Sequence, residues 1–256
     1  PVGDLNHDLG SALELDQMEL VYQPIVDLKT RSLVGFEALV RWQHPQRGAV
    51  MPAEFIPAAE KSGTIIRLGQ FVLDQAAEEL ARMIAAGGEN LFVSINVSSR
   101  QLLRHDLIND VKTVLARHSL PRNALRLELT ESLIMDNPEH STRVLSKVRD
   151  AGAGLALDDF GTGFSSLSHL MRFPFATLKI DRTFQNKKAG PERPIILKSI
   201  VPMAHDLGMQ VIAEGVEGET DALELEHMGC ELAQGFHFGP GVSAVDAMQL
   251  LTKKAA

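Results

Sequence analysis

The chain has 256 residues, of which 45% are hydrophobic and 23% are charged, a balance typical of a globular protein. The formal net charge of −8 argues against a polymeric nucleic-acid partner, because such a partner needs a basic face. No apolar run approaches the roughly 18–20 residues that a membrane helix needs, and no signal peptide opens the chain. Cys230 is the only cysteine, which excludes a disulfide framework and predicts a reducing, cytoplasmic environment.

The first residues form a polar lead. The sequence starts at Pro1 without a methionine and continues as "GDLNHDLGS". We predict that residues 1–17 are a lead-in helix or linker to one domain that runs to residue 256. We also predict that this domain is a piece of a longer protein.

Two apolar segments follow, and together they predict a β-hairpin. Residues 18–28 and 31–42 are separated by a polar turn that is too short for a crossover helix. At least one strand is therefore antiparallel. Side chains alternate along a strand, so Glu37, Leu39 and Arg41 share one face. Glu37 and Arg41 are about 13 Å apart along the strand, a separation suited to gripping opposite parts of one ligand.

The rest of the chain alternates apolar runs with helical patterns. The runs end in a polar residue, at Asn96, Glu131, Asp159, Asp181 and Glu214. Between them, Asn137 is placed to cap a helix whose first residue is Pro138. Gly208 and Gly229 stand where helices commonly stop. The runs begin about 20 to 35 residues apart, which is the repeat of βαβ units.

This pattern predicts an α/β protein with a parallel sheet that is buried on both faces. We expect a modified (β/α)8 barrel with one antiparallel strand. An open doubly wound sheet is the alternative, but the acidic residues come from several strands rather than from one crevice. The segment 185–193 has the composition of an exposed loop.

Polar residues gather at the rim of this predicted barrel. They are Glu37, Asn96, Glu128, Asp158, Asp159, Lys179 and Glu214. A single acidic residue at a strand end would be interpreted as a helix cap or a solvated charge. Together, Glu37, Glu128, Asp158 and Asp159 carry four negative charges, which two divalent ions would balance. Oxygen ligands of this kind suit Mg²⁺ or Mn²⁺ rather than zinc. Arg41 and Lys179 add positive charge suited to a phosphodiester.

Some short motifs would suggest other classes of protein, but the accompanying residues that those classes need are missing. "DFG" at residues 159–161 has neither the glycine-rich loop nor the HRD segment of a protein kinase. "GTGFSS" lacks the third glycine of a dinucleotide fingerprint, and it follows two acids that would repel a pyrophosphate. The nine histidines include no HExxH pair.

Eight segments in order resemble the EAL-domain phosphodiesterases of bacterial cyclic di-GMP signalling. They are "EALVRW", "PAEFIPAAE", "SINVSSRQL", "LELTES", "LDDFGTGFSSL", "LKIDRTF", "VIAEGVE" and "AQGF". The resemblance implies a barrel with one antiparallel strand and hydrolysis of cyclic di-GMP to linear pGpG with two Mg²⁺ or Mn²⁺ ions. Phe164, Ala176 and the segment 238–242 depart from the family's usual residues, which leaves contacts at the substrate's edge open.

The resemblance also implies roles for individual residues. Glu37, Asn96, Glu128 and Asp158 would hold the first metal, and Asp158 and Asp159 the second. Lys179 and Glu214 would serve the attacking water as catalytic groups together with Glu37. The implied substrate-binding residues are Gln23, Arg41, Asp181, Gln234 and Glu217. Glu131, Thr162 and Gly163 would organise the loop between the metals and a dimer interface.

A catalytically silent receptor for cyclic di-GMP is the alternative function. Silent members of such a family are expected to lose a metal ligand or the lysine, whereas this chain keeps Glu37, Asn96, Glu128, Asp158, Asp159 and Lys179. The resemblance further implies a homodimer and a preceding sensory or GGDEF-type domain. The full-length protein could then be anchored in a membrane that the domain itself does not span.

Overall fold

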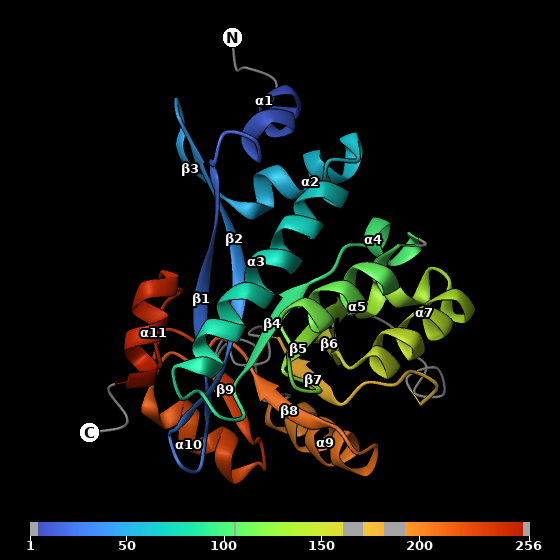
Figure 1. The fold of residues 1–256 in the computed structure, drawn as a ribbon. Coiled ribbons are helices and arrows are strands. Elements are labelled where there is room, and N and C mark those ends of the chain that lie inside the picture. The colour runs from blue at the N-terminus through green and yellow to red at the C-terminus, as the bar shows by residue number, and fades with distance from the viewer. Residues whose placement is uncertain (1–4, 105, 161–170, 182–192, 253–256) are drawn as a thin grey trace.

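The computed structural model describes residues 5–104, 106–160, 171–181 and 193–252, and strands from these ranges form a closed barrel (Figure 1). The sheet order is β1-β9-β8-β7-β6-β5-β4-β2-β3, and a further pairing of β1 with β2 closes it. The strands are β1 (Met18–Asp27), β2 (Leu33–His44), β3 (Gly48–Val50), β4 (Phe92–Asn96), β5 (Leu125–Thr130), β6 (Gly154–Phe160), β7 (Thr177–Ile180), β8 (Gln210–Ala213) and β9 (Leu232–Gln234).

The strand directions confirm the predicted barrel and its hairpin. β1 pairs antiparallel with both β2 and β9. The neighbours from β2 through β4 and on to β9 pair in parallel. The carboxyl ends of the parallel strands therefore lie on one rim, as the sequence predicts for its acidic residues. The open doubly wound sheet is excluded, because its first and last strands would not be joined.

Helices cover the outside of the barrel, except α1 and α2, which lie beyond its rim (Figure 1). The described helices are α1 (Leu5–Ala12), α2 (Pro52–Ser62), α3 (Ile65–Ala85), α4 (Ser99–Leu103), α5 (Leu107–Arg117), α6 (Glu131–Met135), α7 (Pro138–Ala151), α9 (Arg193–Asp206), α10 (Glu219–His227) and α11 (Ala244–Thr252). α3 shows why they pack there, since its buried residues Leu68, Val72, Leu73, Ala76 and Leu80 recur at the spacing of one helix face. None of the helices in the described ranges is long and apolar enough to cross a membrane.

The predicted helix punctuation is confirmed. The Asn137 side chain accepts a hydrogen bond from the backbone N–H of His140, so it caps α7 directly before Pro138. Gly208 and Gly229 have φ values of 75° and 93°, in the left-handed region that favours glycine. Most of the predicted loop 185–193 lies outside the described residues, and α9 begins at its last residue, Arg193.

β2 continues past the barrel rim and supports a small lobe, which we define as α1, α2, β3 and the outer ends of β1 and β2. Its core contains Leu9 of α1, Trp42 of β2 and Phe55 of α2, all fully buried. The Trp42 and Phe55 rings meet edge to face, 5.7 Å apart. α1, which lies within the predicted lead-in residues 1–17, is therefore packed against the strands that continue into the barrel.

The end of the barrel interior that lies opposite the polar rim is closed by an apolar cluster, which we call the barrel floor. Ile25, Phe92, Ile212 and Leu232 form its apolar cluster. The Arg126 guanidinium lies 3.4 Å from the centre of the Phe92 ring, a cation–π contact. A Cβ atom at Gly35 would come within 2.7 Å of the same ring, so only glycine leaves room for it.

Candidate active site

The polar rim residues come from neighbouring strands of the barrel. Glu37 lies on β2, Asn96 ends β4, Glu128 lies on β5, Asp158 on β6 and Lys179 on β7, while Glu214 directly follows β8 and Gln234 ends β9. The sheet register places Glu128 beside Asn96, and Lys179 beside Ile212, two residues before Glu214. Barrel closure therefore brings together side chains that are almost 200 residues apart in sequence, such as Glu37 and Gln234.

The Lys179 ammonium is the centre of this cluster. Its Nζ lies 2.6 Å from Glu128 Oε2, 2.6 Å from Glu214 Oε1, 3.2 Å from Glu37 Oε2 and 3.7 Å from Asp158 Oδ1. Lys179 has no exposed surface, and Glu37 and Glu128 are also buried. A fully buried lysine requires such partners, because an unpaired charge would be too costly away from water.

The cluster has more negative than positive charge. Four carboxylates contact one ammonium, so the ionised groups sum to −3. Burial raises the pKa of Glu128 well above its usual range, and the nearby charges of Glu37 and Asp158 add to this. Burial likewise raises the pKa of Glu214 to about 7, although Lys179 opposes it. The site therefore favours groups that add positive charge, namely protons or metal ions.

Lys179 and Glu37 show the opposite balance. Burial alone would lower the pKa of Lys179, but Glu128, Glu214, Glu37 and Asp158 raise it well above its usual value. Burial alone would raise the pKa of Glu37, yet Lys179 and hydrogen bonds from Gln234 and Asn96 keep it below its usual value. Within this buried set, Lys179 is held as a cation and Glu37 as an anion.

Glu37 is held by a dense set of donors, whereas other acceptors nearby have none. The amides of Gln234 and Asn96 donate to Glu37 at 2.6 Å and 2.8 Å. Glu128 Oε1 and Gln234 Oε1 are buried without a hydrogen-bond partner among the described residues. Buried oxygen atoms rarely stay unpaired, so these two point to a group that the protein does not itself supply.

A distorted stretch of β6 positions the adjacent carboxylates. The β6–β7 register shifts between Leu157 and Phe160, and Asp159 adopts a φ of 54°. This left-handed conformation is strained for a residue other than glycine, and such strain is typical of functional sites. The backbone N–H of Asp159 donates to Asp158 Oδ1 at 2.9 Å. Burial raises the pKa of Asp159, and Asp158 and Asp181 raise it further.

The residues fit a divalent metal by their chemistry, but not in their present arrangement. Carboxylate and amide oxygens are the ligands that Mg²⁺ and Mn²⁺ prefer. In the described part of the chain, however, no three His, Cys, Asp or Glu side chains stand around a point where they could hold one ion. The Lys179 ammonium lies between Glu37, Glu128 and Asp158 instead, so metal binding would require Lys179 to withdraw from them.

Comparison with known families identifies this barrel and its rim. Residues 6–241 match the family described as EAL domain. The chain is an EAL domain. Its relatives include the bifunctional diguanylate cyclase/cyclic di-GMP phosphodiesterase MucR of Pseudomonas aeruginosa, 40% identical over 252 residues, which covers 98% of this chain and 36% of MucR. The cyclic di-GMP phosphodiesterase NbdA of the same species is 39% identical, over 91% of this chain and 30% of NbdA.

Solved structures agree with this family. A structure described as PaMucR phosphodiesterase in complex with c-di-GMP superposes with a TM-score of 0.91 at 39% identity, covering 95% of this chain and 99% of that one. The EAL enzyme Bd1971 in its cGMP-bound form also reaches 0.91, at 34% identity, covering 96% of this chain and 68% of that one. The EAL domain spans about a third of the length of MucR and of two further curated relatives that it matches.

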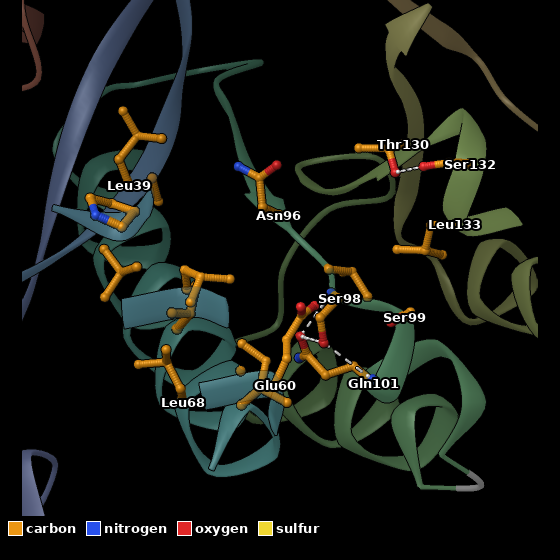
Figure 2. Close-up of a pocket in the computed structure, with 18 of the residues that line it drawn as sticks. Leu39, Glu60, Leu68, Asn96, Ser98, Ser99, Gln101, Thr130, Ser132 and Leu133 are labelled. Atoms are coloured by element: carbon orange, nitrogen blue, oxygen red, sulfur yellow. Dashed lines mark hydrogen bonds between the residues drawn. The ribbon is translucent and has the colours of Figure 1, made fainter. Parts of the chain in front are cut away.

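A cavity of about 500 Å³ lies beside the acidic cluster of the EAL domain (Figure 2). Leu39 and Arg41 line it from β2, Glu60 from α2, and Asn96 joins it to the carboxylates. Opposite α2, Ser98 and Gln101 form a capping box at the start of α4: the Ser98 N–H donates to the Gln101 side chain, and the Gln101 N–H donates to Ser98 Oγ. This wall has room for the Gln101 side chain because residue 69 is glycine.

The predicted substrate-binding residues lie in different surroundings. Gln23 pairs with Glu37 across the β1–β2 hairpin. The Arg41 guanidinium donates to its neighbour's carbonyl, Val40 O, at 2.9 Å. Asp181 lies close to Asp159, whereas Glu217 is exposed on the loop after β8. Gln234 bonds directly to Glu37.

The predicted loop-organising residues are only partly described. Glu131 is buried as the first residue of α6. Thr162 and Gly163 lie outside the described residues, so their predicted role stays a prediction. The structure adds two residues that the sequence analysis did not select, Glu60 and Gln101. The S-x-x-Q spacing of Ser98 and Gln101 was a readable signal of a helix start. Glu60 ends "PAEFIPAAE", one of the segments that carry the family resemblance, but no spacing within that segment predicts a chemical role for it.

Proposed function

We propose that this EAL domain hydrolyses cyclic di-GMP to linear pGpG with the help of two Mg²⁺ or Mn²⁺ ions. The observation that carries the proposal is the buried Lys179 ammonium within reach of four carboxylates at the barrel rim. Relatives similar over nearly the whole chain are named cyclic di-GMP phosphodiesterases, which supports this substrate.

The chain offers oxygen ligands for both ions. We assign Glu37, Asn96, Glu128 and Asp158 to the first ion, and Asp158 and Asp159 to the second. The orphaned Glu128 Oε1 and the excess negative charge support the assignment. When bound, such a pair of ions lowers the pKa of water and stabilises charge on phosphoryl oxygens.

The chain's own residues then bind, orient and move protons. Glu214, whose carboxylate lies 2.6 Å from the Lys179 ammonium, accepts the proton of the attacking water at a carboxylate oxygen. Lys179 holds a positive charge beside the nucleophile. The water oxygen forms a bond to phosphorus while the bond from phosphorus to the ribose oxygen breaks. The ribose oxygen takes up a proton from solvent and leaves as a hydroxyl group. Glu37 keeps the site in place through its bonds to Asn96 and Gln234.

The cavity beside the cluster suits the rest of the substrate. Its apolar wall, with Leu39, Leu68 and Val97, would accept the faces of a purine, and Arg41 would meet a phosphate. The cavity volume of about 500 Å³ lies in the range of small-molecule sites.

Incubation with cyclic di-GMP and Mg²⁺, followed by chromatography, tests the proposal. We expect pGpG to accumulate with the parent protein and not with Glu37→Gln, nor after removal of divalent ions by a chelator. A folded parent protein that binds cyclic di-GMP tightly but leaves it intact would instead be a receptor, the alternative function.

We also propose a homodimer, a cytoplasmic location and a further sensory or GGDEF-type domain in the full-length protein. The two activities in the name of MucR, of which the chain covers 36%, support a further domain. Sedimentation of the purified EAL domain would test the dimer, which should dissociate on dilution.

A further inference from the structure

The cavity beside the acidic cluster is lined by two carboxylates that the proposed chemistry does not use, Glu60 and Asp136. Glu60 lines it from α2, half-buried, among apolar neighbours such as Ile56 and Leu68. In Figure 2, Glu60 of α2 is drawn next to Ser98 and Gln101, which belong to the α4 wall of the cavity. Its place sets it apart from the rim carboxylates, which surround Lys179.

Most other polar side chains that line the cavity already have partners. Arg41 donates to Val40 O, and Asn96 donates to Glu37. Ser98 and Gln101 bond to each other. The Glu60 carboxylate, in contrast, makes no hydrogen bond or ion pair with any residue in the described ranges. A half-buried carboxylate that has no hydrogen bond or ion pair within the described ranges is prepared for donors on a ligand.

The second carboxylate at this cavity has a different environment. Asp136 follows α6 and is exposed, so water solvates its charge. Glu60 is therefore the carboxylate with more to gain from a bound ligand.

The kind of donor follows from the ligand's own charge. A cyclic dinucleotide carries two phosphates, which a carboxylate would repel. Glu60 can face such a ligand only where it presents hydrogen-bond donors, which are the ribose 2′-hydroxyl groups and the N–H groups at the edge of a base. The Watson–Crick edge of guanine presents two adjacent donors, N1–H and the exocyclic N2 amine, which match the two oxygens of one carboxylate.

We propose that Glu60 selects guanine, by accepting hydrogen bonds from N1–H and N2–H of one base of the cyclic dinucleotide. This inference rests on the proposed function and adds to it the residue that determines base specificity. Adenine presents an acceptor at N1 and would leave Glu60 partly unpaired. Hypoxanthine keeps N1–H but lacks the exocyclic amine, so it would form only one of the two bonds.

Equilibrium binding of cyclic di-GMP, cyclic di-AMP and cyclic di-inosine monophosphate to the parent protein and to Glu60→Gln tests the proposal. The control is Glu54→Gln, an exposed glutamate on the same helix α2. We expect Glu60→Gln to weaken cyclic di-GMP binding by about ten- to a hundredfold, the range for hydrogen bonds to a charged group. Binding of cyclic di-AMP should change far less, so the preference for guanine should collapse, whereas Glu54→Gln should keep it.

The outcomes separate this proposal from the proposed function. If Glu60→Gln weakens all three ligands equally, or keeps the parent's preference, Glu60 does not read the base. Loss of the preference in Asp136→Asn instead of Glu60→Gln would also overturn the proposal. A parent protein that binds cyclic di-GMP selectively without hydrolysing it would refute the proposed function alone. A parent that binds no cyclic dinucleotide would refute both.

Discussion

The two ends of the barrel interior are built on the same strands by opposite means. On β5, Arg126 belongs to the floor and Glu128, two residues later, belongs to the acidic cluster. On β8 and its end, Ile212 packs in the floor and Glu214 contacts Lys179. At the floor the Arg126 guanidinium lies over the Phe92 ring. At the rim, Glu128 Oε1 and Gln234 Oε1 have no hydrogen-bond partner among the described residues, and the ionised groups around Lys179 have an excess of negative charge. One end is thus closed by packing, and the other is left for ligands.

The largest expected effect lies at the rim. Glu37→Gln should reduce turnover of cyclic di-GMP by about a hundred- to a thousandfold, because Glu37 is the carboxylate that Asn96, Gln234 and Lys179 jointly hold. Circular dichroism should show an unchanged fold. More than a tenth of the parental rate would show that the rim does not depend on Glu37.

Lys179→Met should separate charge from packing. It leaves the four carboxylates around Lys179 without their cation. The metal-free protein should therefore lose about 3–5 kcal/mol of unfolding free energy. Turnover should also fall, by more than binding of cyclic di-GMP does. Because Mg²⁺ would take the place of the ammonium, it should raise the melting temperature of the variant more than that of the parent. An equal rise in both proteins would contradict the claim that Mg²⁺ and the Lys179 ammonium compete for these carboxylates.

At the barrel floor, Gly35→Ala should lower the free energy of unfolding and leave the turnover of cyclic di-GMP unchanged. The added Cβ would lie 2.7 Å from the Phe92 ring, which is packed and held under Arg126, so we expect a loss of about 1–3 kcal/mol. Urea unfolding measures that loss, and kcat/KM of the folded enzyme should stay near the parental value. Gly10→Ala is a matched control, because no atom lies within 4 Å of its added Cβ.

The smallest effect is a dependence of stability on pH. The pKa of Glu214 is about 7 in the folded protein, whereas an ordinary glutamate, as in the unfolded chain, has a pKa of 4.5. The folded state therefore binds the proton more tightly. Its contribution to stability is complete below pH 4.5 and is lost as the pH rises through about 7. Without divalent metal, the parent should therefore lose stability across this window relative to Glu214→Gln. Parallel curves for the two proteins would contradict the raised pKa.

Much of this arrangement could be predicted from the sequence, because each strand carries its own signal. Apolar runs that end in Asn96, Asp159 or Glu214 mark strand ends, and parallel strands deliver those ends to one rim. The short polar turn before β2 predicted the antiparallel strand β1. These signals are local, so no knowledge of the closed barrel was needed to read them.

Other features depend on contacts that only barrel closure creates. The position of Lys179 among four carboxylates combines residues from β2, β5, β6, β7 and the end of β8. The stacking of Arg126 on Phe92 joins β5 and β4, and no sequence pattern in either segment predicts this contact. The left-handed conformation of Asp159 was also unpredicted, because aspartate has no intrinsic need of it.

β2 gives the EAL domain a mechanical connection along its length. The same unbroken strand holds Trp42 in the core of the lobe and Glu37 among the carboxylates, about 17 Å away at the rise of a β-strand. A hydrogen-bonded strand resists stretching, so a push or pull on α1 that tilts the Trp42 end would also tilt the Glu37 end. A segment joined to the N-terminal side of this domain could thus move Glu37 in the acidic cluster through α1 and β2, without contacting the cluster itself.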